Sequence, residues 1–379
     1  MRRSGTPLKV GRGRKDRIRA EASRLLAAGV AGQVFPGGAA CVAYREAGEV
    51  VYAFGTGGHL SRGGAKVRED TPYDLASLTK PFVATAALRL ADQGVIDLGA
   101  RADSVLPDVR SGPGGGATIE QLLAHRSGLS AWGGLYLDVP HEPGTPAARR
   151  WMLNESSRRS ERPAGTKTEY SDLGYMIAGE LLARAAGVPL ADLIEQEVTS
   201  VLGIDREVYY AGTLGAERTA ELMRTAPPTE FCDWRERLIV GEVHDENCAA
   251  LGGVAGHAGL FGNAHGVAVF GRAMLDVLAG ESSYLPAQAL IDALAPRDEE
   301  ARYRMGWDSK SGTESSAGRR FGPRSFGHLG FTGTSIWIDP DVDIVVVLLT
   351  NRVHPSRANE KIRGFRPAFH DGIMATFKG

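Results

Sequence analysis

The stretch TSIWIDPDVDIVVVLL, residues 334–349, decides the fold of this chain. Its first part, residues 334–338, is rich in β-branched and aromatic residues, and Asp339-Pro340-Asp341 supplies a polar turn. The return segment, residues 344–349, is an unbroken apolar run rich in β-branched residues, which is typical of a buried strand. The sequence therefore predicts a β-hairpin in the core, close to the end of the chain.

A second hairpin is predicted near the start of the chain, and helices are predicted around and between the two hairpins. Residues 37–54, GGAACVAYREAGEVVYAF, form two strand-like runs around a turn at residues 46–48. Apolar spacing and capping residues predict helices at residues 18–30, 77–94, 118–128, 172–187, 267–278 and 357–378. Strands at both ends with helices between them predict an α+β fold. In this fold a central antiparallel sheet from both termini is flanked by helices and carries an inserted, mostly helical region.

The expected organisation is one folded domain behind a short extension. A length of 379 residues suits two or three domains or one large multilayer domain. Residues 1–14 are expected to form a basic, flexible N-terminal extension. Residues 15–379 are expected to form a single domain, with an α/β part at about 15–75 and 285–379 and a helical part at about 76–284. Residues 132–168 and 207–250 are predicted to be long irregular loops that shape a pocket.

Composition excludes several classes of protein. The 44 Lys and Arg residues nearly balance the 45 Asp and Glu residues, so no global field favours nucleic acid or an anionic membrane. Cys41, Cys232 and Cys248 are too few and too far apart for a disulfide framework, and no Cys-x-x-Cys is present. The basic N-terminus lacks the apolar core of a signal peptide, and no run approaches the ~18 apolar residues of a membrane span. We expect a cytoplasmic protein without nucleic-acid partner, membrane span, metal or cofactor.

The candidate nucleophile is Ser77, in the tetrapeptide Ser77-Leu78-Thr79-Lys80. Residues three apart on a helix share a face, so the Lys80 amine would lie beside the Ser77 hydroxyl. A serine needs an adjacent base to become a good nucleophile, and a buried lysine with a lowered pKa can serve. The alternative is a helix-capping serine followed by a surface lysine. No Gly-x-Ser-x-Gly elbow and no His-Glu-x-x-His are present to support another class of hydrolase.

Two further motifs follow in the chain, Tyr170-Ser171-Asp172 and GHLGFTGT at residues 327–334. With DLASLTK at residues 74–80 and LLAHRSGL at residues 122–129, they resemble the β-lactamase and penicillin-binding-protein superfamily of serine hydrolases. The similarity is to the branch that contains class C β-lactamases, DD-peptidases and esterases, and it extends from about residue 33 to 352. It implies the fold of that superfamily and a small-molecule ester or amide substrate.

The resemblance also implies roles for individual residues. Ser77 would be the acylated nucleophile, Lys80 its proton partner, and Tyr170 the phenol or phenolate that moves protons to the leaving group and the water. The backbone N–H groups of Ser77 and Phe331 would form the oxyanion hole, with Gly330 as a supporting neighbour. The implied activity is hydrolysis of an ester or amide through an acyl-enzyme on Ser77. The alternatives are a DD-peptidase, a weak β-lactamase or a non-catalytic penicillin-binding-like sensor.

Two positions depart from the usual motifs of that branch. Asp172 stands where asparagine is usual, and an ionised carboxylate accepts hydrogen bonds but cannot donate them. Asp172 would pair with Lys80, accept from a substrate N–H or cap a helix. His328 stands where lysine is usual, and an imidazole holds a substrate carboxylate less firmly than an ammonium group does. Both departures argue against an efficient β-lactamase.

Two further segments narrow the resemblance to one subgroup of this branch. VHDEN at residues 243–247 and LGGVAGHAGLF at residues 251–261 are similar to a subgroup that includes amidases acting on muramyl peptides. A muramyl-peptide substrate is therefore expected beside simple esters and amides. His244, Asp245 and His257 match no zinc-binding spacing, so we expect them to face the substrate or brace a loop.

Overall fold

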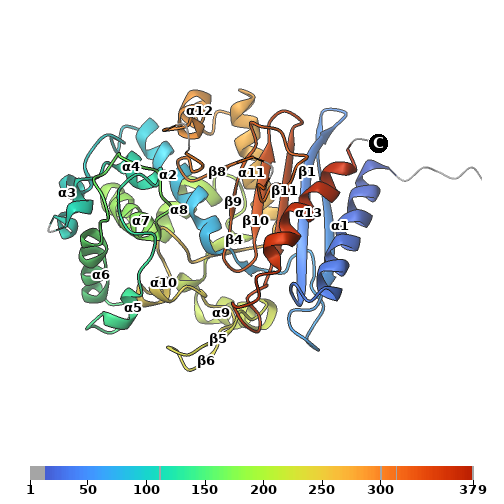
Figure 1. Ribbon diagram of the computed structural model, residues 1–379, viewed down its shortest axis with the longest axis horizontal. Helices are drawn as coiled ribbons and strands as arrows, with labels where there is room; N and C mark the ends of the chain where they lie inside the picture. The colour runs from blue at the N-terminus through green and yellow to red at the C-terminus, as the bar shows by residue number, and fades with distance from the viewer. Residues whose placement is uncertain (1–12, 111, 299–300, 313, 378–379) are drawn as a thin grey trace, which may run out of the picture.

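The computed structural model describes residues 13–110, 112–298, 301–312 and 314–377, and its main sheet draws strands from both ends of the chain (Figure 1). The strand order is β2-β1-β11-β10-β9-β8. Every neighbouring pair is antiparallel, so the predicted sheet is confirmed. Its strands are β1 (Gly37–Glu46), β2 (Glu49–Gly58), β8 (Asp308–Ser309), β9 (Phe326–Leu329), β10 (Ser335–Asp339) and β11 (Ile344–Thr350).

Strand β11 is buried on both faces, as its unbroken apolar run predicts. Val346 and Leu348 pack on one face against α1 (Arg14–Ala31) and α13 (Ile362–Ala375). Val345 and Val347 pack on the other face against α11 (Ala264–Leu278), in the core cluster that also includes residues of the helical region. In Figure 1 the two terminal helices cover the outer side of the sheet and the helical region lies beyond its other side. The hydrophobic core therefore forms two layers separated by the sheet.

The helical region forms most of the middle of the chain. Its α-helices are α2 (Thr79–Asp92), α3 (Ala102–Val105), α4 (Ile119–Leu123), α5 (Leu135–Asp138), α6 (Pro146–Arg158), α7 (Asp172–Ala186), α8 (Leu190–Ile194), α9 (Ala216–Thr225), α10 (Glu246–Ala250) and α12 (Ala287–Leu294). Short helical turns are η1 (Ala76–Leu78), η2 (Pro107–Val109), η3 (Pro113–Gly116), η4 (Glu195–Thr199) and η5 (Ala211–Thr213). Two small sheets accompany them, β3 (Tyr73–Asp74) with β7 (Leu260–Gly262) and β4 (Val208–Tyr210), and β5 (Phe231–Cys232) with β6 (Arg237–Leu238).

Three predicted elements differ from the structure. The helix predicted over 118–128 ends at Leu123, because His125 takes a left-handed φ of 57° that reverses the chain. The predicted loop 132–168 contains α6, whose Thr145 cap and Pro146 at the first position are ordinary start signals for a helix. The predicted loop 207–250 contains β4 and α9, so both segments are more regular than expected.

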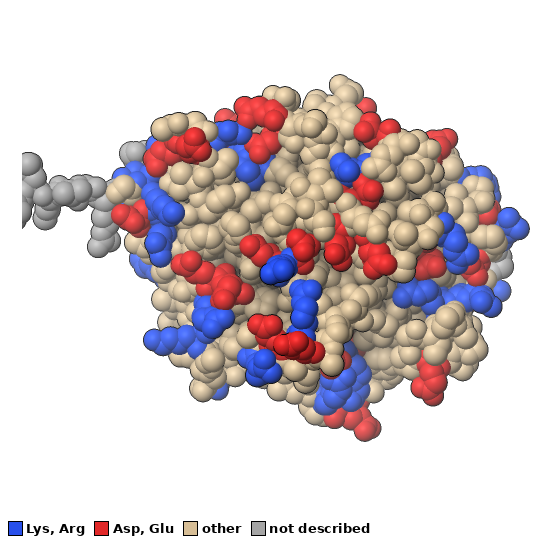
Figure 2. All heavy atoms as spheres, turned by 180° about the vertical axis from the view of Figure 1, so that it is seen from behind, with Lys and Arg blue, Asp and Glu red and all other residues tan. Residues whose placement is uncertain are grey.

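Three further predictions concern the surface charge, the lack of a membrane span and the basic N-terminal extension. On the face in Figure 2, basic and acidic side chains are interspersed. No helix among the described residues is long and apolar enough to cross a membrane. Most of the predicted basic extension, residues 1–12, lies outside the described residues, and α1 begins within its last positions. The extension and the division of the chain into α/β and helical parts stay predictions.

Candidate active site

Ser77 lies in a sharp turn between a strand and a helix. Strand β3 leads through the turn η1 into α2, and Ser77 is the middle residue of η1. Ala76 has a φ of 48°, a left-handed conformation that side chains disfavour, and the Asp74 carboxylate accepts a 2.8 Å hydrogen bond from its N–H. Thr332 Oγ1 also donates to the Asp74 carbonyl at 2.8 Å. Several groups thus hold the turn that presents Ser77 to the pocket.

Lys80 lies directly beside Ser77 and is fully buried, which excludes the alternative of a surface lysine. Its Nζ donates to Ser77 Oγ at 2.8 Å and to the His257 carbonyl at 3.1 Å. The same atom lies 2.7 Å from Asp172 Oδ1. Burial lowers the pKa of Lys80, although the Asp172 carboxylate opposes the change. The amine is therefore closer to a neutral base than an exposed lysine is.

Tyr170 approaches Ser77 from the other side, as the protein chain enters α7. Its phenol donates to Ser77 Oγ at 2.8 Å. Burial and the neighbouring Asp172 charge raise the pKa of Tyr170 well above its usual value. This shift favours the phenol over the phenolate, the other form that the resemblance implies, and a phenol can give a proton.

Strand β9 ends beside the turn that carries Ser77. Thr334, in the turn between β9 and β10, donates from Oγ1 to the Leu75 carbonyl at 3.1 Å, which ties this turn to the chain before Ser77. A Cβ at Gly330 would collide with Thr334 Oγ1, so only glycine fits this close approach. Within the described part of the chain, no hydrogen-bond acceptor takes the amide N–H of Ser77 or Phe331. Both residues line the pocket.

The two departures from the usual motifs have clear structural consequences. Ser171 caps α7 by accepting a hydrogen bond from Gly174 N at 3.1 Å, so Asp172 is not the cap and instead pairs with Lys80. Burial and the Lys80 charge lower the pKa of His328 to about 3, which keeps its ring neutral. His328 Nδ1 lies 2.9 Å from the Leu329 carbonyl and must be the donor, because a carbonyl only accepts. His328 therefore offers the pocket a lone pair on Nε2 rather than a positive charge.

His125 holds the backbone on both sides of Tyr170. Its carbonyl accepts from Glu169 N at 2.8 Å, and its ring Nδ1 accepts from Ser171 N at 3.0 Å. The buried ring packs against the Tyr170 ring, with centroids 4.6 Å apart. His125 belongs to the motif at residues 122–129, which by itself predicts no role for this side chain. Its contacts with Tyr170 join two motifs far apart in the chain, which no local pattern reveals.

In the segment 243–247, Asp245 contacts His257, and both residues line the pocket. Asp245 Oδ1 accepts from Cys248 N at 2.7 Å and lies 2.8 Å from His257 Nε2. Burial raises the pKa of Asp245, but the charge and hydrogen bond of His257 lower it overall. The His257 carbonyl accepts a hydrogen bond from Lys80 Nζ. The Asp245–His257 pair is therefore linked to Lys80 through the backbone of His257. No group of three or more His, Cys, Asp or Glu side chains in the described ranges could hold a metal ion.

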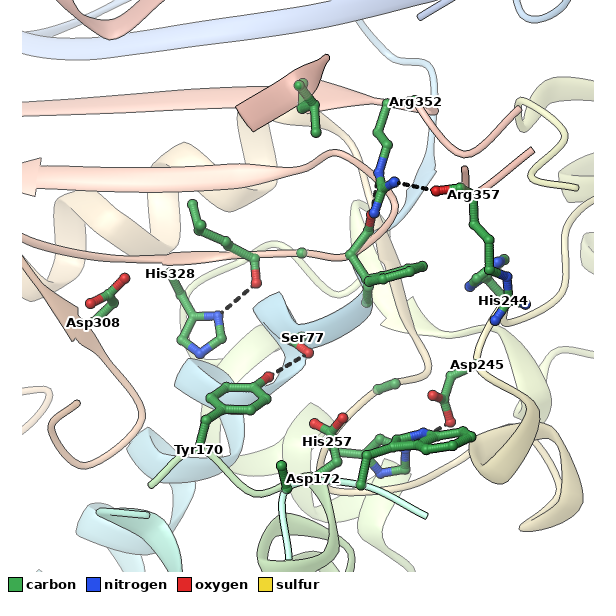
Figure 3. Close-up of a pocket in the computed structure, with 18 of the residues that line it drawn as sticks. Ser77, Tyr170, Asp172, His244, Asp245, His257, Asp308, His328, Arg352 and Arg357 are labelled. Atoms are coloured by element: carbon green, nitrogen blue, oxygen red, sulfur yellow. Dashed lines mark hydrogen bonds and ion pairs between the residues drawn. The ribbon is translucent and has the colours of Figure 1, made fainter. Parts of the chain in front are cut away.

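The pocket around Ser77 has a volume of about 630 Å³ (Figure 3). Ser77, Tyr170, Asp172 and His328 gather at one side of the view, and Arg352 and Arg357 come from the other side. The pocket also has lining residues to which the sequence motifs assign no individual role, among them Trp132, Arg302, Tyr303, Asp308, Arg352, Arg357, Arg363 and Arg366. They come from loops, from β8 and from α13, and folding brings them to the motifs.

Comparison with known proteins gives consistent results. A family described as Beta-lactamase matches residues 22–366. A relative, the N-acetylmuramyl-L-alanine amidase of Bacillus subtilis (strain 168), is 31% identical over 325 residues, 79% of this chain and 72% of the relative. A putative D-alanyl-D-alanine carboxypeptidase of Salmonella agona (strain SL483) is 29% identical over 318 residues, 77% of this chain and 72% of the relative.

Solved structures agree with the predicted fold. The octameric penicillin-binding protein homologue from Pyrococcus abyssi superposes with a TM-score of 0.68 at 18% identity. The superposition covers 89% of this chain and 74% of that chain. At this identity the likeness concerns the fold alone, and it confirms the α+β architecture that the hairpins and motifs predict.

Proposed function

Because the chain belongs to the β-lactamase family and is a serine hydrolase, we propose that it forms an acyl-enzyme on Ser77 and hydrolyses an amide or ester bond in a muramyl-peptide substrate. The observation that carries this proposal is the convergence on Ser77 Oγ, which lies 2.8 Å from both Lys80 Nζ and the Tyr170 hydroxyl. A nucleophile with a base on one side and an acid on the other has the groups needed for acyl transfer.

In the proposed acylation, Lys80 in its unprotonated form takes the Ser77 proton as Oγ attacks the substrate carbonyl carbon. The amides of Ser77 and Phe331 donate hydrogen bonds to the oxyanion that forms. The Tyr170 phenol gives its proton to the departing nitrogen or oxygen as the scissile bond breaks. Lys80 then returns its proton to the Tyr170 oxygen, so the net transfer is from Ser77 to the leaving group. Water enters for deacylation and the same groups work in the reverse direction.

The substrate class is supported by the relatives and by the charge of the site. The relative with 31% identity is named for an amidase that cleaves N-acetylmuramyl-L-alanine bonds. The neutral His328 offers no ammonium for the carboxylate of a β-lactam, which disfavours rapid β-lactam turnover. The half-exposed rings of Trp132 and Phe331 give the pocket apolar surface for a larger ligand.

The second candidate is a DD-carboxypeptidase, which the Salmonella relatives favour by name. The two candidates differ in the bond that is cut. An N-acetylmuramyl-L-alanine amidase cleaves the bond between the lactyl carbonyl and L-alanine. A DD-carboxypeptidase instead removes a terminal D-alanine. A third candidate, a sensor, would be acylated on Ser77 without turnover.

A panel of three substrates tests these candidates: N-acetylmuramyl-L-alanyl-D-isoglutamine, a diacyl-L-Lys-D-Ala-D-Ala peptide and 4-nitrophenyl butyrate. We expect release of L-alanyl-D-isoglutamine and of nitrophenol, with both activities absent in Ser77→Ala. A reactive organophosphonate should add its mass at Ser77 of the wild-type chain. Release of D-alanine alone would favour the carboxypeptidase, and labelling without turnover would favour the sensor. Activity retained in Ser77→Ala would contradict the nucleophile.

The remaining expectations from the sequence concern partners and location. The absence of a nucleic-acid partner, a metal and a cofactor stays a prediction from composition. A cytoplasmic location is likewise a prediction, which fractionation of the producing cells can test.

A further inference from the structure

The aromatic side chains that line the pocket differ in what their rings contact. The rings of Tyr170, Tyr303 and Phe331 each pack on another ring or on a cation. Within the part of the chain that the structure describes, no ring and no cation packs on Trp132, and its indole N–H has no hydrogen-bond acceptor. Trp132 is also 49% exposed, whereas tryptophan is mostly covered in folded proteins. The pocket therefore contains one large apolar ring that the described protein leaves without a partner.

The residues just before Trp132 are tied to the second motif of the site. Ser171 Oγ donates to the Ser130 carbonyl at 2.7 Å. Asp172 N donates to the Ala131 carbonyl at 2.8 Å. Because both donors follow Tyr170 directly in the chain, the backbone that leads to Trp132 is fixed relative to the groups around Ser77.

Asn247, the last residue of the segment 243–247, holds the backbone that follows Trp132. Its side chain is fully buried. Nδ2 donates to the Gly133 carbonyl at 2.7 Å, and Oδ1 accepts from Tyr136 N at 3.1 Å. Both ends of this amide are thus used on the loop that carries Trp132. An apolar ring on a backbone fixed at both sides is preorganised, because little conformational freedom is lost when a ligand contacts it.

The other walls of this pocket are polar, which limits the kind of ligand that suits Trp132. The polar and charged side chains that line the same pocket include those of His244, Asp245, Glu246 and Arg357. A flat apolar ring in a pocket with polar walls suits a ligand that has an apolar face and polar groups around its rim. A pyranose ring has this form, since C–H groups cover its face and hydroxyl groups surround it. An alkyl chain would cover the ring but would leave the polar groups desolvated without partners.

From this arrangement we infer that Trp132 is a stacking platform for the sugar ring of the substrate, and that Asn247 is the positioning residue that holds it. The inference rests on the proposed function, because it names the part of a muramyl peptide that contacts Trp132. In such a substrate the sugar is joined through the lactyl ether to the carbonyl that Ser77 attacks. The sugar therefore lies on the acyl side of the scissile bond, and Trp132 acts on the choice of substrate rather than on bond cleavage.

Two amides with the same scissile bond test the platform. N-acetylmuramyl-L-alanyl-D-isoglutamine, the muramyl amide, is compared with (R)-2-methoxypropanoyl-L-alanyl-D-isoglutamine, the truncated amide, in which a methyl group replaces the sugar. We expect wild-type kcat/KM to favour the muramyl amide by about 10-fold or more. This ratio should fall toward unity in Trp132→Ala and keep part of its size in Trp132→Phe, whose ring is smaller. The kcat/KM for the truncated amide should change little in either variant.

Asn247→Ala tests the positioning role, because it removes both hydrogen bonds to the Trp132 loop. It should lower the ratio between the two amides while kcat for the truncated amide stays near the wild-type value, and a melting temperature checks that the variant folds. Leu137→Ala is the matched control, since Leu137 is an exposed apolar residue of the neighbouring α5 and does not line the pocket. We expect it to keep the wild-type ratio. A wild-type ratio near unity, or an unchanged ratio in Trp132→Ala, would overturn the inference.

An alkyl chain is the alternative occupant of the Trp132 ring. The esters 4-nitrophenyl octanoate and 4-nitrophenyl butyrate are compared in the wild type and in Trp132→Ala. We expect the ratio between these esters to be the same in both proteins. A preference for octanoate that Trp132→Ala abolishes, together with no preference for the muramyl amide, would assign the ring to an alkyl chain and overturn the inference.

A binding measurement works without turnover and separates this inference from the proposed function. The muramyl amide and the truncated amide are titrated by calorimetry into the Ser77→Ala chain. We expect a lower Kd for the muramyl amide, and the difference should disappear when Trp132→Ala is added. This result supports the platform even if the wild-type chain cleaves neither amide, an outcome that would contradict the proposed function alone. Equal Kd values for the two amides, or no saturable binding of the muramyl amide, would reject the platform.

Discussion

In the region of the pocket around Ser77, the reacting groups contact one another, whereas in the region of Trp132 the indole ring has no partner among the described residues. Lys80 has Asp172 at 2.7 Å, and burial changes the proton affinity of its amine. Trp132 is half-exposed on a loop that Asn247 holds. The difference indicates a division of labour, in which one region moves protons and the other binds the sugar of the substrate. Changes in the first region should alter kcat for all substrates, and changes in the second should alter the choice among them.

The largest effect is expected from Lys80→Arg. Arginine keeps the positive charge beside Asp172 but cannot take the Ser77 proton at accessible pH. We expect kcat for 4-nitrophenyl butyrate to fall by at least about 10³-fold, close to the loss in Lys80→Met. Circular dichroism and the melting temperature check that both variants fold. An active Lys80→Arg enzyme would mean that Lys80 acts through its charge alone, and the contrast between the two regions would fail.

The second largest fall in kcat is expected from Tyr170→Phe. The variant removes the proton donor but keeps the ring that packs on His125. We expect kcat to fall by about 10² to 10³-fold with KM changed little, because general acid–base catalysis acts in the transition state. The effect should be larger for an amide than for a nitrophenyl ester, whose leaving group needs no proton. A change in KM alone would make Tyr170 a binding residue.

The double variant Asp172→Asn with His328→Lys tests substrate choice at the boundary between the two regions. It restores an amide donor and a cation at positions where this chain has an acceptor and a neutral ring. Each contact is worth roughly 1–3 kcal/mol, so the ratio of nitrocefin to ester kcat/KM should rise by about 10-fold or more. Stopped-flow and steady-state assays on both proteins measure it. Rapid nitrocefin turnover by the wild type, or an unchanged ratio, would contradict this account of the two departures.

The smallest effect is expected at His125, which we treat as a positioning residue for Tyr170. His125→Ala loses the ring acceptor for Ser171 N and should lower kcat by about 10-fold. His125→Asn keeps a side-chain acceptor and tolerates a left-handed φ, so it should recover part of the loss. The preference for the muramyl amide over the truncated amide should stay at the wild-type ratio in both variants. If both variants lose the same stability and have the same kcat as each other, His125 has a structural role only.

Local sequence patterns predicted the elements that depend on interactions between residues close together in the chain. The β11 run at residues 344–349 is buried on both faces because alternate side chains point to opposite faces and all of them are apolar. Spacing of three on a helical turn brought Lys80 to Ser77. Loop 132–168 was mispredicted because its polar residues outweighed the start signal at Thr145-Pro146.

Other features depend on tertiary contacts between segments far apart in the chain. The sequence by itself identified Ser77, Lys80 and Tyr170 as a set through three separated motifs, and it identified His328 as an unusual residue. Only the folded chain buries Lys80 and His328, and burial is what changes their pKa values, since desolvation disfavours the charged form. Likewise, the carboxylates that pair with Arg357, Glu230 and Glu246, lie more than 100 residues away in the chain and meet it only in the folded protein. The Glu360–Arg363 pair, by contrast, has a spacing of three that the sequence alone makes visible.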